Sequence, residues 1–111
     1  MPTPTIDRAT FDELKETAGP DFVVELVDTL LAEAPLMLED LRSALAMGDA
    51  DRFRRAAHSL KSNSSTFGAL GLADMARALE LGGLPPDDAA VDALARQVDT
   101  TLAALQALAR Q

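Results

Sequence analysis

Apolar residues recur every three or four positions along nearly the whole chain, and this spacing constrains the fold more than any other feature. Between about residues 21 and 47 the stripe consists of Val23, Leu26, Leu30, Met37, Leu41 and Leu45. Near the end of the chain it consists of Val91, Leu94, Val98, Leu102 (or Thr101), Leu105 and Leu108. No stretch shows the alternation of apolar and polar residues that is typical of strands. The pattern therefore predicts an all-α fold.

Glycine, proline and aspartate residues divide this pattern into separate helices. Gly19 ends a short first helix, and Pro20 suits the first turn of the second. Pro35 interrupts the second stripe and has no backbone N–H, so we expect a kink or a break there. Gly48 and Asp49 mark a stop and a restart, with Asp49 as the N-cap of a third helix over about 50 to 67.

The second half of the chain adds two more helices. Gly68 and Gly71 allow a bend before a short fourth helix, which carries Leu72, Met75, Ala76 and Leu79. The sequence "GGLPPDD" is the clearest loop, and its two aspartates can start the last helix. We therefore predict a single domain over residues 1–111, an antiparallel four-helix bundle with a short extra N-terminal helix. Residues 1–6 are expected to be disordered.

Composition excludes several classes of function. The net charge of −8 argues against nucleic acid as the partner and favours a basic or mixed protein surface. Because the chain has no cysteine, it has no disulfide, thiol nucleophile or thiolate metal site. No apolar run is long enough to span a membrane, and "MPTPTIDR" lacks the apolar core of a signal peptide. These features predict a cytoplasmic protein, and its largely polar surface predicts a monomer.

The single histidine, His58, lies within a cluster of cations on the third predicted helix. On a helical wheel it points away from the core stripe of that helix, which consists of Phe53, Ala57, Leu60, Ser64 and Phe67. The residues on its own face are Arg54, Arg55, Lys61, Ser62 and Ser65. A lone exposed histidine usually has no function, but here the local charge is opposite in sign to that of the whole chain. The residues after Lys61 are also small, which leaves the imidazole accessible.

These side chains suit a covalently bound anion. A neutral imidazole nitrogen is a competent nucleophile at physiological pH. A phosphoryl group on it would bring roughly two negative charges. Lys61, one turn away, could offset that charge together with Arg54 or Arg55, and Ser65 could donate a hydrogen bond. The residues alone therefore predict that His58 carries an anionic group.

The segment "AHSLKSNSSTFGA" resembles the motif of histidine-containing phosphotransfer (HPt) domains, in which a histidine is followed by leucine, lysine and a run of small residues. His58, Leu60, Lys61 and Gly68 match that motif in register, whereas Ser62 stands where the family usually has glycine. The resemblance extends through "DFVVELVDTLLAEAPLMLEDLRSALAMGDADRFRRAAHSLK", including the Ala-Pro pair within the helix and the Gly-Asp turn. It covers nearly the whole chain.

The resemblance implies a phosphocarrier rather than an enzyme. Such domains are four-helix bundles that relay phosphoryl groups between aspartates of response-regulator receiver domains, in pathways that begin at a sensor or hybrid histidine kinase. It implies that His58 is phosphorylated and that Lys61 stabilises the phosphoryl charge. Ser62, Ser65 and Gly68 would shape the surroundings, and Gly68 would allow close packing near the helix end. No cofactor or metal is implied, since the Mg²⁺ belongs to the receiver domain.

Four other readings compete with this one. An ATP-dependent kinase is opposed by the lack of a glycine-rich phosphate loop and by the short chain. A metal-dependent or hydrolytic enzyme is opposed by the single histidine and the scattered acidic residues. A non-catalytic helical scaffold, which the departure at Ser62 would favour, stays open. Direct phosphorylation of His58 by a separate histidine kinase also stays open.

Overall fold

The computed structural model describes residues 5–111, and five helices account for most of them. They are α1 (Arg8–Ala18), α2 (Pro20–Met47), α3 (Ala50–Thr66), α4 (Leu70–Leu81) and α5 (Ala89–Ala109). Within this range there is no strand, so the predicted all-α class is confirmed. None of these helices combines the length and the apolar character that crossing a bilayer requires.

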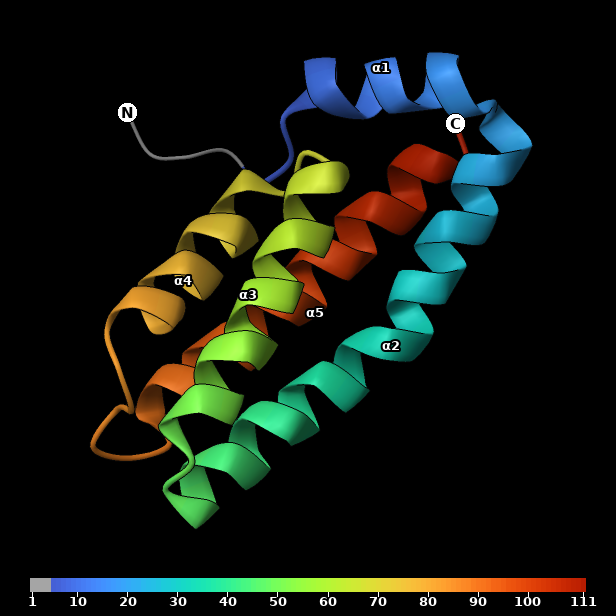
Figure 1. Cartoon of the computed structure of the whole chain (residues 1–111). Helices are drawn as coiled ribbons and strands as arrows, with labels where there is room; N and C mark the ends of the chain where they lie inside the picture. The colour runs from blue at the N-terminus through green and yellow to red at the C-terminus, as the bar shows by residue number, and fades with distance from the viewer. Residues whose placement is uncertain (1–4) are drawn as a thin grey trace.

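Four of the helices form a closed bundle. α2 packs against α3 and α5, and α4 packs against the same two helices. Neighbours in the ring run in opposite directions, and α1 lies across one end, where it contacts α2 (Figure 1). This is the predicted antiparallel four-helix bundle with a short extra helix at the N-terminus.

The turn between α2 and α3 has the predicted geometry. Gly48 adopts a left-handed conformation with φ of 69°, and its N–H donates to the last carbonyls of α2. The Asp49 carboxylate then accepts a hydrogen bond of 3.0 Å from the backbone N–H of Arg52. Asp49 is therefore the N-cap of α3, because its side chain satisfies one of the amides that the first helical turn leaves without a partner.

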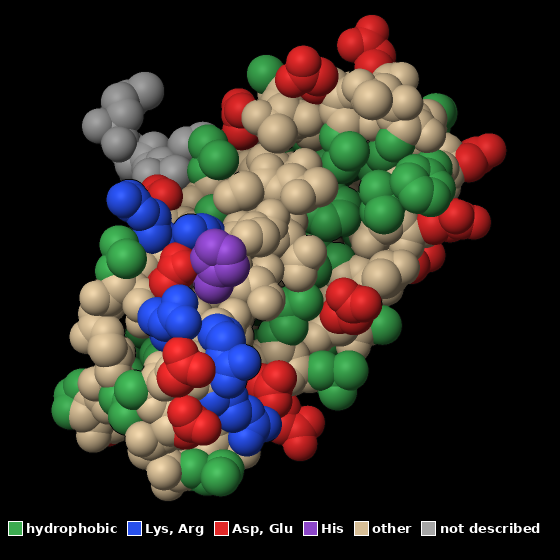
Figure 2. Space-filling model, in the orientation of Figure 1, with side chains coloured by type: hydrophobic (Ala, Val, Ile, Leu, Met, Phe, Trp, Pro, Cys, Tyr) green, Lys and Arg blue, Asp and Glu red, His purple; other side chains and the backbone are tan. Residues whose placement is uncertain are grey.

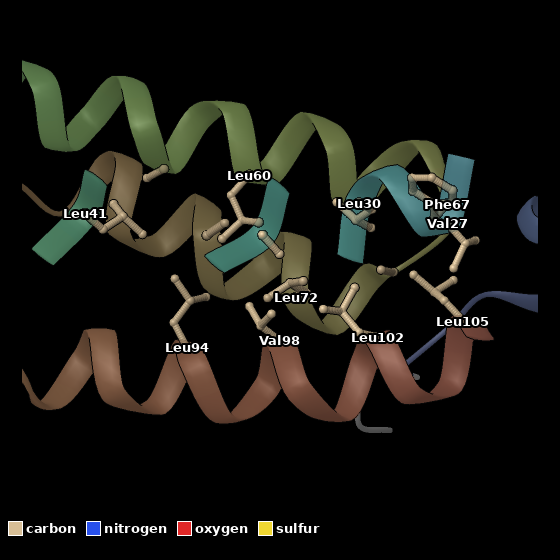
Figure 3. Close-up of a cluster of buried hydrophobic side chains, with 14 of the residues drawn as sticks. Val27, Leu30, Leu41, Leu60, Phe67, Leu72, Leu94, Val98, Leu102 and Leu105 are labelled. Atoms are coloured by element: carbon tan, nitrogen blue, oxygen red, sulfur yellow. The ribbon is translucent and has the colours of Figure 1, made fainter. Parts of the chain in front are cut away.

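The core fixes the rotation of α3. Its predicted stripe is buried, with Phe53, Ala57 and Leu60 each at most 1% exposed, and it packs against leucines and valines of α2, α4 and α5 (Figure 3). Ser64 lies in the same stripe, and its hydroxyl donates a hydrogen bond of 2.7 Å to the carbonyl of Leu60, so it carries no unsatisfied polar atom. Rotating α3 would expose this stripe, so the opposite face is held toward solvent.

Helix α2 continues through Pro35, where the sequence predicts either a kink or a break. The helix is continuous from Pro20 to Met47, so the possible break is wrong. Its ribbon changes direction about midway along its length (Figure 1). Proline removes only the hydrogen bond to the carbonyl four residues earlier, that of Leu31. Pro35 is exposed, so water can reach this part of the helix and the remaining bonds hold the helix together.

The segment before α1 is tied to the bundle. Ile6 packs against the core, and the backbone N–H of Asp7 donates a hydrogen bond of 2.7 Å to the carbonyl of Gly68. The disorder predicted for residues 1–6 therefore does not describe Ile6. The rest of that prediction falls largely on residues 1–4, which lie outside the described residues.

Candidate functional site

His58 lies on the solvent side of α3, and 56% of its side chain is exposed. Its neighbours Ala57 and Leu60 are fully buried, so the packing of α3 places the imidazole at the surface. Figure 2 shows this ring with both basic and acidic side chains around it. The predicted accessibility of His58 is therefore present in the structure.

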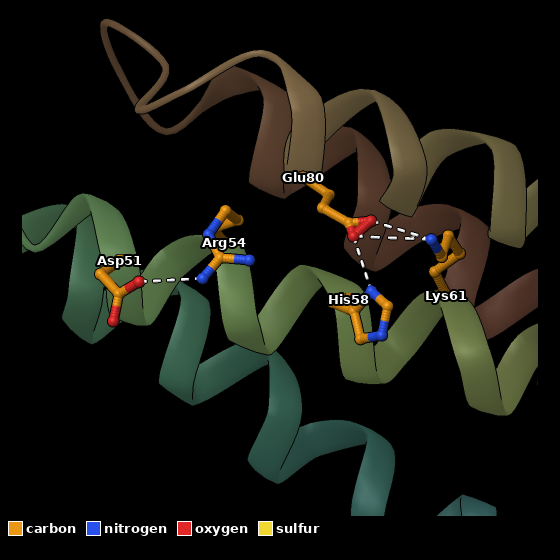
Figure 4. A network of polar contacts seen from close by, with 5 residues as sticks. All are labelled: Asp51, Arg54, His58, Lys61 and Glu80. Carbon is orange, nitrogen blue, oxygen red and sulfur yellow. Dashed lines mark hydrogen bonds and ion pairs between the residues drawn. The ribbon is translucent and has the colours of Figure 1, made fainter.

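A second helix supplies a partner that the sequence analysis missed. The Oε2 atom of Glu80, near the end of α4, lies 2.7 Å from Nδ1 of His58. Only 9% of the Glu80 side chain is exposed, although the ring it contacts is open to solvent (Figure 4). Glu80 follows His58 by 22 positions, so no helical wheel of α3 could show this contact.

Lys61 binds the same carboxylate. Its Nζ atom lies 2.9 Å from Oε1 and 3.5 Å from Oε2 of Glu80, and 28% of its side chain is exposed. The hydrogen bond from Lys61 is the main cause that holds the pKa of Glu80 below its ordinary value, and the hydrogen bond with His58 is the second. Glu80 is therefore ionised at neutral pH. His58, Glu80 and Lys61 form one connected group, which we call the carboxylate bridge.

The two predicted arginines are engaged elsewhere. Nη2 of Arg54 lies 2.9 Å from one oxygen of Asp51, and Nε of Arg55 lies 3.0 Å from the other. The hydrogen bond from Arg54 and the charge of Arg55 lower the pKa of Asp51. Both arginines lie on the helix that carries His58, but their guanidinium groups bind Asp51 (Figure 4 draws the Arg54 pair).

The three small residues named from the motif occupy different places. Ser62 and Ser65 are exposed on α3, about one and two turns beyond His58. Gly68 is buried after the end of α3, about 15 Å along the helix axis from His58. A Cβ atom on Gly68 would lie 2.8 Å from the carbonyl oxygen of Asp7 and 3.0 Å from Cβ of Thr10. The close packing predicted at Gly68 is thus present, against the start of α1.

Among residues 5–111, no three histidine or acidic side chains gather closely enough to hold a metal ion. Chemically, the carboxylate bridge offers one exposed nucleophilic nitrogen, one nearly buried anion and one cation.

Comparison with known proteins gives the family. The family model described as the Hpt domain matches residues 25–108. The chain belongs to the Hpt domain family. It is similar to a crystal structure of histidine-containing phosphotransfer protein B (HptB) from Pseudomonas aeruginosa PAO1, with a TM-score of 0.76 and 31% sequence identity. That similarity covers 99% of this chain and 95% of the other. A search of curated proteins gives no match.

Family membership and the structural similarity support the predicted function. The chain is a histidine phosphotransfer domain of phosphorelays, a phosphocarrier rather than an enzyme. Hpt membership also implies its partners, which are receiver domains and histidine kinases.

Proposed function

We propose that His58 accepts the phosphoryl group on its Nε2 atom, receiving it from one receiver-domain aspartate and passing it to another. The observation that carries this proposal is the state of the two ring nitrogens. Nδ1 contacts Glu80 at 2.7 Å, while the ring itself is 56% exposed. Nε2 is therefore the nitrogen that a partner can reach.

The transfer is a substitution at phosphorus. The Nε2 lone pair attacks, a P–N bond forms, and the P–O bond to the donor aspartate breaks, so that the donor recovers its carboxylate. In the second half of the relay the acceptor carboxylate attacks and the P–N bond breaks. Each step exchanges one bond for another, so no oxidant, reductant or water is consumed.

Lys61 offsets charge during transfer. In the unphosphorylated protein its ammonium group binds Glu80. A phosphoryl group on His58, one turn away, offers more negative charge than a single carboxylate, so Lys61 can share its three donors between the two. Arg54 could assist only by releasing Asp51. Ser62 is small and exposed, so it keeps the approach to the ring clear.

The partner would supply what this chain lacks. We propose that Mg²⁺ enters with the receiver domain and that His58 needs no metal or cofactor bound by its own chain. Figure 2 shows apolar side chains over α2 on the same face as His58, and the exposed Phe22 and Leu36 belong to that helix. An apolar patch with a charged edge suits a protein partner rather than nucleic acid or a membrane. We also propose that the protein is a monomer and that it acts in the cytoplasm.

The test is transfer of radiolabelled phosphate from a phosphorylated receiver domain to the protein and to its His58→Gln variant. Several receivers from the same organism are used, because a non-cognate pair transfers slowly. The proposal expects acid-labile, base-stable label on the wild type and none on His58→Gln. Label that persists on a folded His58→Gln variant would place the acceptor elsewhere. A folded wild type that binds a receiver but takes no label from any would favour a scaffold.

A further inference from the structure

Ser62 carries a hydroxyl group that the bundle itself does not use. Four other hydroxyl side chains on the helices donate a hydrogen bond to the carbonyl oxygen four residues earlier, namely those of Thr29, Ser64, Thr66 and Thr100. The Ser62 hydroxyl makes no such bond, and within residues 5–111 it has no hydrogen-bond partner. Ser62 is exposed on α3, so its hydroxyl can bind a group that arrives from solvent.

Ser62 lies on the opposite side of His58 from Lys61. A helix turns about 100° per residue, so Lys61 lies about 60° to one side of His58 and Ser62 about 40° to the other. Lys61 and the ring atom Nδ1 both contact Glu80, which places α4 on the Lys61 side. Figure 4 shows Nε2 of the ring pointing away from Glu80. Nε2, the atom that we propose is phosphorylated, is therefore on the side of the ring that Ser62 occupies.

The tilt of helical side chains favours Ser62 over its neighbours. Side chains on an α-helix lean toward its N-terminus, so Ser62, one turn after His58, leans toward the imidazole. Arg55 is one turn before His58, so its side chain leans away from the ring, and its Nε atom lies 3.0 Å from Asp51. Ser65 is two turns after His58, about 10 Å along the helix axis. Ser62 therefore carries the hydroxyl that is best placed to reach a group on Nε2.

We infer that the Ser62 hydroxyl donates a hydrogen bond to a phosphoryl oxygen on His58 and so stabilises the phosphorylated protein. This inference rests on the proposed function and deepens it. A phosphoryl group on Nε2 presents three acceptor oxygens and about two negative charges. Lys61 can bind one oxygen from the α4 side, and Ser62 can bind a second from the opposite side. The third oxygen remains open to the receiver domain.

The hydroxyl changes the energy of the phosphorylated state as well as the access to the ring. Before phosphorylation it binds water, and afterwards it binds a charged oxygen, which forms a stronger hydrogen bond than a neutral one does. Because the site is exposed, competition with water reduces the gain. We expect this hydrogen bond to favour phosphorylated His58 by about three- to tenfold. The glycine that the Hpt motif usually has at this position provides no such donor.

The test measures phosphotransfer in both directions with one receiver domain. The forward rate is that of labelling by the phosphorylated receiver, and the reverse rate is that of label returning from purified phosphorylated protein. Their ratio is the equilibrium constant, and contacts with the partner alone leave it unchanged because they change both rates by the same factor. We expect Ser62→Ala and Ser62→Gly, which both lack the hydroxyl, to lower this ratio by about three- to tenfold. Ser59→Ala is the matched control and should keep the wild-type ratio, because this exposed serine follows His58 directly and does not share its face.

The Ser62→Ala variant is expected to fold, because the position is exposed and alanine is a better helix former than serine. An unchanged ratio in Ser62→Ala, including one in which both rates change by the same factor, would overturn the inference and leave the proposed function intact. A loss of equal size in Ser59→Ala would also overturn the inference. A wild type that takes no label from any receiver would overturn the proposed function and the inference with it.

Discussion

Replacing Gly68 with alanine tests whether this residue serves packing or the phosphoryl site. Gly68 has φ of 76°, and an added Cβ would lie 2.8 Å from the carbonyl oxygen of Asp7. Gly48 has nearly the same conformation, with φ of 69°, but nothing lies within 4 Å of its added Cβ. The two substitutions therefore share the cost of a left-handed alanine, and only one of them adds a steric clash.

The two costs have different magnitudes. Left-handed backbone costs alanine about 1–2 kcal/mol. Forcing extra atoms into a packed site costs about 1–3 kcal/mol more, and here the nearest atom belongs to backbone, which cannot swing aside. For a domain of this size, 1 kcal/mol corresponds to about 4 °C in Tm. Gly48→Ala should therefore lower Tm by about 4–8 °C and Gly68→Ala by about 8–20 °C.

Thermal unfolding followed by circular dichroism measures both variants against the wild type. Phosphotransfer is measured well below the lowest Tm, and we expect Gly68→Ala to retain nearly the wild-type rate because Gly68 is remote from His58. Equal Tm losses in the two variants would refute the packing argument. A Gly68→Ala protein that is stable but transfers poorly would show that Gly68 serves the phosphoryl site rather than packing.

Three further perturbations have defined outcomes. Lys61→Ala should slow transfer to His58 by about tenfold to a hundredfold, because a charge-assisted contact is lost; stopped-flow or gel-based rates would measure it, and an unchanged rate would remove Lys61 from the site. Folding lowers the pKa of Glu80, so its carboxylate stabilises the protein above the ordinary glutamate pKa and that stability is lost as the pH falls through the folded-state pKa. Urea unfolding should therefore show a larger loss in Glu80→Gln at about pH 7 than at about pH 3, and equal losses would contradict the bridge. Asp51→Asn should barely change Tm, because the Arg54 and Arg55 pairs are exposed; a large drop would show that they stabilise α3.

Most of the fold followed from local signals in the sequence. Helix ends were predictable where a specific residue satisfies the backbone, as Asp49 does at the start of α3. Burial was predictable where one spacing governs a whole helix, as it does from Phe53 to Ser64. The effect of Pro35 was harder to judge, because it depends on whether the rest of the helix is held in place by its neighbours.

The site was only partly predictable, and for a physical reason. A helical wheel gives the face on which a side chain lies, so it placed His58 and Lys61 correctly at one surface. It does not give the partner that a side chain selects. Arg54 lies one turn from both Asp51 and His58, and a carboxylate attracts a guanidinium more strongly than a neutral ring does.

Glu80 could not be found from the motif, because its position depends on how α4 packs against α3. A weak signal was present, since Glu80 is the one acidic residue in the last turn of a helix otherwise rich in apolar residues. Helix-end acids are unfavourable beside the negative end of the helix dipole, so an acid there suggests a specific contact. Only the packed structure showed that the contact is His58.

The central claim is that the phosphoryl group resides on His58, and the most direct measurement is mapping of the modified residue. The protein is phosphorylated by a receiver domain, digested at neutral to alkaline pH to preserve phosphohistidine, and sequenced by tandem mass spectrometry. Our account predicts a single phosphoryl group, and it predicts that this group is on His58, the only histidine in the sequence. A phosphoryl group on Ser62, Ser65 or any aspartate, with His58 unmodified, would contradict it.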